Sequence, residues 1–342
     1  MKRIALPLAA LMAVAATAYY SLPALFKEPL VQLNRTIAGL TEKSVRIDGH
    51  EVHYLEGGKG ETVVLLHGIF AEKDHWVDFA RPLADAYRIV APDLPGFGES
   101  SRLDGHSYDY AAQTERLKEL LDAVGAKRVH LAGNSMGGTI AALFAIRYPE
   151  RVASVAFIGA PHGIRSPKPS EADRLIDAGR LPLIARDEAE FEQMLGRVFA
   201  RRPFLPYPIL HAARSGAVQR AESNVRLWNA QLKDRFLLHE QIAGLRVRSM
   251  ALWGREDRIF DVSGATVLQA QLVDGEVQIM PDVGHLPMME APADAAGRYA
   301  RFLAGRVQMG WNRAPRTIDA PPQQPAYTVA MPPSTSRFSP ST

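Results

Sequence analysis

The 342-residue sequence contains no cysteine, which excludes disulfides, thiolate nucleophiles and cysteine-based metal sites. It has no run of lysine and arginine, and its formal net charge of +3 is small, so nucleic acid is not an expected partner. The sequence holds no phosphate-binding loop or dinucleotide fingerprint, and its histidines and carboxylates do not follow one another at metal-ligand spacing. We therefore expect a protein that needs neither a metal nor another cofactor.

The N-terminal segment has almost no charge. Residues 4–20 carry no charged side chain, and Lys2 and Arg3 precede them. About 20 apolar residues cross a bilayer as a helix, and basic residues stay on the cytoplasmic side. We therefore predict that residues 1–26 form a membrane anchor, with the body of the chain on the non-cytoplasmic side, which is the periplasm in a bacterium. The Ala-Thr-Ala run at 16–18 also fits a signal-peptide cleavage site, and cleavage would make the protein secreted.

The body of the chain predicts an α/β fold, a mostly parallel sheet with helices on both faces. Short apolar runs alternate with helical patterns, and Asp48-Gly49 marks an opening hairpin within 43–56. The runs lie at 62–67, 88–92, 128–132, 155–159, 250–253 and 277–280, and a helix is expected over 110–124.

Two further segments lie outside this alternation. Residues 162–245 contain helical and proline-punctuated stretches such as 187–199 and 221–238, so we predict a helical cap inserted into a core of 43–161 and 246–308. Residues 313–342 are rich in Pro, Ser, Thr and Gln and predict a disordered tail.

The run GNSMG at 133–137 is a G-x-S-x-G motif between an apolar run and a helical pattern. In that context the motif predicts a sharp turn that lifts a nucleophilic serine, here Ser135, clear of the backbone. A serine hydroxyl becomes a good nucleophile only when a base accepts its proton and an acid orients that base. His285 follows the last apolar run and is the predicted base, and Asp257, in the loop after 250–253, is the predicted acid.

Two neighbours of the acid are alternatives for the same role, Glu256 and Asp261. The tetrahedral intermediate also needs two aligned N–H donors. We expect one from Met136, which follows the serine, and the other from Ile69 in the loop after the run 62–67, with Phe70 as the alternative.

These residues, with HG at 67–68, DLPGFGES at 93–100 and VGH at 283–285, make the chain resemble the α/β-hydrolase superfamily over about residues 45–303. Within it, GNSMGG at 133–138 and FDVSGA at 260–265 are similar to membrane-anchored monoacylglycerol-lipase-type serine hydrolases with a helical cap. That resemblance implies an α/β-hydrolase fold and hydrolysis of a glycerol or related carboxyl ester. The expected partners are then a lipid or other acyl-ester substrate and a membrane.

The resemblance leaves the substrate open. The main alternative is a carbon–carbon bond hydrolase of ring-fission products, because such enzymes share the GNSMGG string. Cofactor-free haloperoxidase-type relatives share the triad and are a further possibility. A binding module on the same fold is the hypothesis from outside the enzymes. A bilayer tether favours amphiphilic esters because it raises their local concentration. Phe70, Phe204 and Leu205 are the candidate substrate-binding residues. The last two lie in the segment 199–210, which mixes bulky apolar residues with two arginines and either flanks an acyl entrance or packs the cap onto the body.

Overall fold

The computed structural model describes residues 2–305, with side chains from residue 12 onward, and the predicted tail at 313–342 lies outside the described residues. Its centre is an eight-stranded sheet in the order β1-β2-β4-β3-β5-β6-β7-β8. The β1–β2 and β2–β4 pairs are antiparallel and the other neighbours are parallel. The prediction of a mostly parallel sheet is confirmed.

The strands lie where the apolar runs predicted them. The opening hairpin pairs β1 with β2 and turns at Asp48 and Gly49, both with positive φ. All seven residues of β5 are buried, as expected for a central strand covered on both faces. The strand bounds are β1 Leu40–Ile47, β2 His50–Gly57, β3 Thr62–Leu66, β4 Arg88–Pro92, β5 Val129–Ser135, β6 Val152–Pro161, β7 Ser249–Gly254 and β8 Gly275–Met280.

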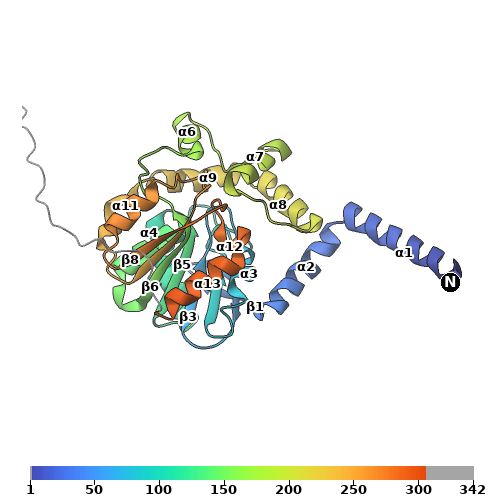
Figure 1. Cartoon of the computed structure of the whole chain (residues 1–342), viewed down its shortest axis with the longest axis horizontal. Coiled ribbons are helices and arrows are strands. Elements are labelled where there is room, and N and C mark those ends of the chain that lie inside the picture. The colour runs from blue at the N-terminus through green and yellow to red at the C-terminus, as the bar shows by residue number, and fades with distance from the viewer. Residues whose placement is uncertain (1, 306–342) are drawn as a thin grey trace, which may run out of the picture. The chain divides into compact units, whose positions relative to one another are not determined.

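Helices cover both faces of the sheet, and the core is therefore two apolar clusters with the sheet between them (Figure 1). One cluster receives α4 (Tyr110–Ala123), α5 (Met136–Arg147) and α11 (Gly264–Gln271). The other receives α3 (Val77–Ala80), which follows the single turn η1 (Lys73–Trp76), and α12 (Pro287–Glu290) and α13 (Pro292–Leu303). Helix α4 begins at the cap Asp109, whose side chain accepts from the Ala112 amide, as a helix start requires.

Between β6 and β7 the described chain forms helices, which gather at one end of the sheet (Figure 1). They are α6 (Glu171–Asp177), α7 (Glu188–Val198), α8 (Tyr207–Gln219), α9 (Ala221–Leu232) and α10 (Leu237–Gln241). The helix expected over 221–238 ends at Leu232. The chain turns there and brings Arg235 to Asp173 on α6, at 2.6 Å, a long-range contact that helical periodicity does not reveal. The predicted core and cap boundaries remain predictions.

At the N-terminus the chain forms α1 (Lys2–Ser21) and α2 (Ala24–Ile37). The rings of Tyr20 and Tyr207 lie 5.1 Å apart, so the end of α1 contacts the start of α8. In the part of the chain that the structure describes, no helix has both the length and the apolar character needed to cross a membrane. The predicted membrane anchor over 1–26 is therefore not supported by the structure.

A buried cluster of charges joins α2 to the loop after β3. Arg35 on α2 is 2% exposed and donates two hydrogen bonds to Asp74, at 2.7 and 2.6 Å, and a third to Glu42. Next to Asp74, Lys73 is 1% exposed and pairs with Asp93 at 2.9 Å. Buried charges are stable only when paired in this way, so the cluster fixes where α2 docks.

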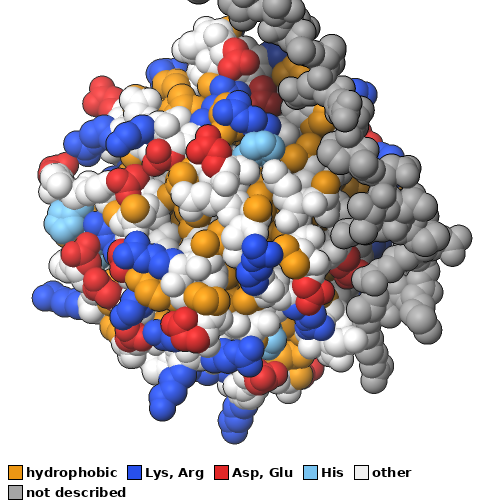
Figure 2. Space-filling model, turned by 90° about the vertical axis from the view of Figure 1, so that its left-hand side faces the viewer, with side chains coloured by type: hydrophobic (Ala, Val, Ile, Leu, Met, Phe, Trp, Pro, Cys, Tyr) orange, Lys and Arg blue, Asp and Glu red, His pale blue; other side chains and the backbone are white. Residues whose placement is uncertain are grey.

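The surface on the side of α11 and β8 mixes charges of both signs. Figure 2 shows lysine and arginine side chains interspersed with aspartate and glutamate across that face. A nucleic-acid footprint would be a basic stripe or patch, and this face does not present one.

Candidate active site

Ser135 is the last residue of β5, and α5 begins directly after it. Its φ of 51° and ψ of −116° are a conformation that a residue with a side chain rarely adopts, as expected where strain serves function. The flanking glycines make this turn feasible. A Cβ on Gly133 would lie 2.3 Å from the Gly137 carbonyl oxygen, and one on Gly137 would lie 2.2 Å from that of Leu66. Glycine is therefore required at both positions.

The predicted acid and base meet in a buried pair. His285 Nδ1 lies 2.8 Å from Asp257 Oδ2, and both side chains are almost fully buried. The other oxygen, Oδ1, accepts from the backbone amides of Ile259 and Phe260 at 2.8 and 2.9 Å. Because an ionised carboxylate only accepts, Nδ1 of His285 carries the proton, and its Nε2 is free to accept one.

Neither alternative acid makes this contact. Glu256 is exposed, although it is adjacent to Asp257 in sequence. Asp261 uses its carboxylate within its own loop, where it accepts from the Ser263 amide at 2.9 Å. The geometry therefore favours Asp257 over both.

The loop that carries His285 is held by two residues that the sequence analysis did not single out. Asn134, beside the serine, donates to the carbonyl oxygens of Ile158 at 2.8 Å and His285 at 3.0 Å. Glu290 accepts from the amides of Gly284, Ala200 and Arg201, at 2.9, 2.8 and 3.0 Å. Burial raises the pKa of Glu290. Asn134 lies inside the recognised motif, whereas no motif marks Glu290.

The loop after β3 lies against the serine. A Cβ on Gly68 would be 2.8 Å from Asn134 Oδ1 and 3.3 Å from Ser135 Cβ, so nothing larger than glycine fits there. Ile69 and Phe70 follow at the cavity wall, and Phe70 has a φ of 59°. Met136 is buried as the first residue of α5, where backbone amides lack helical partners. The predicted oxyanion donors Ile69 and Met136 thus flank the serine from two elements.

His67 has a structural role in this loop. Its Nε2 accepts from the Leu94 amide at 2.9 Å, which requires the proton to sit on Nδ1, and Nδ1 donates to the Gly68 carbonyl at 2.7 Å. Burial lowers the pKa of His67 to about 4, so the ring is neutral near pH 7. It fastens the loop after β3 to the turn after β4.

Ser135 and His285 open into a cavity of about 180 Å³ beneath α7, α8 and α9. Phe70 and Leu205 are part of its wall, whereas Phe204 is 90% exposed and is not among the lining residues. The apolar part of the wall consists of Ile69, Phe70, Ala71, Phe97, Leu183, Ala185, Phe191, Met194, Leu195, Val198, Phe199, Leu205, Leu210, Ala213, Ala217, Leu286 and Met289. A cavity with such walls suits an alkyl chain.

Comparisons with known proteins agree with this geometry. Residues 61–200 match the family described as alpha/beta hydrolase fold. Lipase 1 of Psychrobacter immobilis is 31% identical over 283 residues, which are 80% of this chain and 88% of that protein. The chain belongs to the α/β-hydrolase family. It is a hydrolase of the lipase/esterase type.

Two further relatives carry informative names. Monoacylglycerol lipase abhd6-B of Xenopus laevis is 30% identical to this α/β hydrolase over 72% of this chain and 76% of its own. A crystal structure described as a membrane phospholipase A, a novel bacterial virulence factor, is 40% identical, with a TM-score of 0.81. It covers 90% of this chain and 99% of its own. The two names differ in whether the lipid carries a phosphate headgroup.

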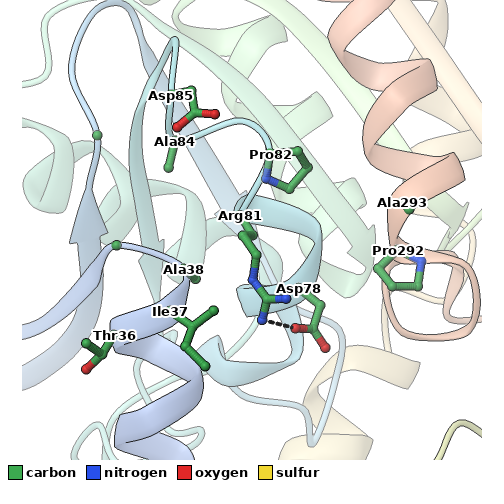
Figure 3. A pocket seen from close by; sticks show the side chains of 12 residues that line it. Thr36, Ile37, Ala38, Asp78, Arg81, Pro82, Ala84, Asp85, Pro292 and Ala293 are labelled. Carbon is green, nitrogen blue, oxygen red and sulfur yellow. Dashed lines mark hydrogen bonds and ion pairs between the residues drawn. The ribbon is translucent and has the colours of Figure 1, made fainter.

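A second, larger hollow of about 730 Å³ lies elsewhere on this α/β hydrolase, and Figure 3 shows its wall. It is bounded by the end of α2, by 78–85 and by the start of α13, and it contains the Arg81–Asp78 ion pair at 2.7 Å. It shares no lining residue with the cavity at Ser135. We therefore place the chemistry of the hydrolase at the smaller cavity.

Among the residues that the structure describes, two groups of side chains have ligand atoms close enough together to hold a metal ion, within 4.8 Å of one another. One consists of Asp48, His50 and His106, and the other of Glu42, His53 and Glu99. Their members come from different elements, so sequence spacing did not reveal them. Arginine already pairs with each group, Arg116 with Asp48 at 2.8 Å and Arg35 with Glu42, so neither group is assigned a metal.

Proposed function

We propose that this hydrolase cleaves carboxyl esters of acyl-glycerol lipids through an acyl-enzyme at Ser135. The observation that carries the proposal is the cavity in which Ser135 and His285 meet apolar walls, with His285 bonded to Asp257 behind it. The names of the lipase relatives support an ester with an acyl chain.

In the proposed reaction, His285 Nε2 accepts the proton of the Ser135 hydroxyl while the oxygen attacks the ester carbonyl carbon. Asp257 keeps the imidazole in the correct tautomer and stabilises its positive charge. The amides of Ile69 and Met136 stabilise the oxyanion, and loss of one such donor costs about 10²–10³ in turnover. His285 then protonates the leaving alcohol, and water, activated by the same histidine, releases the fatty acid.

Hydrolysis of a matched series of monoacylglycerols, from acetyl through decanoyl to oleoyl, tests the proposal. We expect activity that rises with chain length, because longer chains bury more apolar surface on the cavity wall. The Ser135→Ala variant should lose activity by several orders of magnitude, and a fluorophosphonate should label the unmodified chain but not this variant. Activity confined to the acetyl ester, or activity that survives in Ser135→Ala, would contradict the proposal.

The location of the protein is also a proposal. The N-terminal segment predicts a catalytic body on the non-cytoplasmic side of a membrane, or a secreted protein if the segment is removed. Fractionation of expressing cells and N-terminal sequencing of the recovered protein distinguish the two. Recovery in the cytosolic fraction with Met1 intact would exclude both.

A further inference from the structure

Two arginines line the cavity at Ser135, and neither pairs with a carboxylate of the described residues 2–305. Arg102 comes from the loop after β4, and Arg220 links α8 to α9. Arg102 donates to the Gly96 carbonyl at 2.8 Å, to Asn224 Oδ1 at 3.1 Å and to the Ser223 hydroxyl. All three acceptors are uncharged, so these bonds hold the guanidinium in place but do not neutralise it.

The two positive charges act on each other. Burial and the charge of Arg220 lower the pKa of Arg102, and no carboxylate is among the groups that influence it. Arg220 is exposed, and its guanidinium lies over Gly216 of α8, where a Cβ would be 2.8 Å from Nη2. Like charges held close without a counter-ion are unfavourable unless an anion binds between them. In the described part of the chain, the other arginine of this region, Arg226, is already paired with Asp104.

The remaining ionisable groups on the wall do not cancel this charge. Besides His285, they are Glu72 and His75. Burial raises the pKa of Glu72, and in the described part of the chain its carboxylate forms no ion pair with either arginine. The cavity therefore combines an apolar wall with one cationic patch.

We propose that Arg102 and Arg220 form a subsite for the phosphate-bearing headgroup of an acyl lipid, whose chain lies along the apolar wall. Arg220 provides a forked donor that matches phosphate oxygens, and Arg102, whose Nε and Nη1 are already bonded, adds Nη2 and its positive charge. Because Arg220 is exposed, the bound anion lies at the mouth of the cavity, where a hydrated headgroup belongs. The proposal takes its reaction from the proposed function, but its binding step does not depend on that reaction.

The test measures binding to the Ser135→Ala protein, so it needs no hydrolysis. Decyl phosphate, monodecanoylglycerol and inorganic phosphate are titrated by calorimetry. Decyl phosphate has both a phosphate headgroup and an alkyl chain, monodecanoylglycerol has a chain with an uncharged headgroup, and inorganic phosphate has no chain. Each is compared in the Ser135→Ala background and with Arg220→Gln or Arg102→Gln added. Arg226→Gln is the matched control, since it removes the same charge from an exposed, paired arginine on α9.

We expect Arg220→Gln to weaken decyl phosphate binding about tenfold or more, which corresponds to about 1.4 kcal/mol, and to leave monodecanoylglycerol binding unchanged. Arg220→Lys should restore part of the affinity, because it keeps the charge but not the fork. Equal loss for both amphiphiles would mean that the arginines only support the cap, and would overturn the subsite. So would an unchanged affinity for decyl phosphate, or an equal loss in Arg226→Gln.

The other outcomes of these measurements distinguish the proposed ester hydrolysis from the proposed phosphate subsite. If inorganic phosphate binds as tightly as decyl phosphate, the site recognises free phosphate and the lipid assignment is wrong. If decyl phosphate binds through Arg220 but the unmodified protein hydrolyses no ester, the proposed function fails and the subsite stands. If esters are hydrolysed through Ser135 but the affinity for decyl phosphate is unchanged in both arginine variants, only the subsite proposal is contradicted.

Discussion

The side-chain amide of Asn134 donates to the main-chain carbonyl oxygen of His285 at 3.0 Å. The residue next to the proposed nucleophile therefore holds the loop of the proposed base, 151 residues further along the chain. The same amide also donates to Ile158 on β6, so the contact is anchored in the sheet.

The Asn134→Ala variant removes both bonds without touching the proposed triad. We expect kcat on a monoacylglycerol to fall about 10²-fold with little change in KM, because small displacements of a catalytic group are costly. Steady-state kinetics and thermal unfolding measure the two effects separately. Asn229→Ala, at an exposed position on α9, is the control and should change neither. An unchanged kcat in Asn134→Ala would mean that His285 is placed by its other contacts.

Substitutions at the adjacent residues Phe204 and Leu205 should affect substrate KM differently, although the sequence suggested the same role for both residues. Leu205 is part of the cavity wall and Phe204 is 90% exposed. Leu205→Ser should therefore raise KM for the oleoyl ester more than for the acetyl ester, because it removes apolar contact with the chain. Phe204→Ser should leave both KM values unchanged when the substrate is monomeric. Equal effects of the two variants would contradict this assignment of the wall.

Local periodicity was sufficient to predict the sheet, and contiguous motifs were sufficient to propose the site residues that lie within them. The apolar runs become β3 to β8, and Asp48-Gly49 becomes the predicted hairpin turn. Ser135 could be singled out because the turn at the end of β5 requires glycine at both neighbouring positions of the motif.

Residues that act through distant partners could not be predicted in this way. Glu290 binds amides of the segment 200–201, and Arg35 binds Asp74, 39 residues away. Arg102 likewise donates to Asn224 on α9, 122 residues further along the chain. A single sequence does not encode such pairs in any local pattern, since the topology of the whole chain decides which side chains meet.

His67 should make the folded protein sensitive to acid. Its pKa is lowered by burial from 6.5 to about 4, so between these pH values the unfolded chain binds a proton that the folded protein does not. The stabilisation is complete above pH 6.5 and is lost as the pH falls through 4, by about 3 kcal/mol in all. Urea unfolding from pH 7.5 to 4 should show a smaller decrease in the free energy of unfolding for His67→Gln than for the unmodified protein. The glutamine amide oxygen can still accept from the Leu94 amide. The exposed His106→Gln should behave as the unmodified protein does. An identical pH dependence in His67→Gln would exclude His67 as the cause.

Arg35 should contribute strongly to stability. Arg35→Met removes the cation that is hydrogen-bonded to Asp74 and Glu42 and leaves them Lys73, at 3.8 Å from each, and breaking a buried ion pair on one side costs about 3–5 kcal/mol. Lys43→Met is the matched control, because Lys43 is 51% exposed where it pairs with Glu56 and should change the unfolding free energy by less than about 1 kcal/mol. Chemical denaturation measures both. If both variants lose a similarly small amount of unfolding free energy, the cluster around Arg35 is solvated in solution.

Two glycine-to-alanine substitutions should change the free energy of unfolding in opposite directions. A Cβ on Gly137 would lie 2.2 Å from the Leu66 carbonyl oxygen, which β3 holds in the sheet, so Gly137→Ala should destabilise the protein by about 3 kcal/mol or more and abolish activity. Gly196 lies within α7, where an added Cβ would have no atom within 4 Å apart from its chain neighbours and the backbone of its own helix. Gly196→Ala should therefore raise the unfolding free energy by roughly 0.5–1 kcal/mol, because alanine has the higher helix propensity. Thermal unfolding and ester hydrolysis of both variants provide the check. A folded, active Gly137→Ala protein would mean that the turn at Ser135 does not need the close approach of α5 to β3.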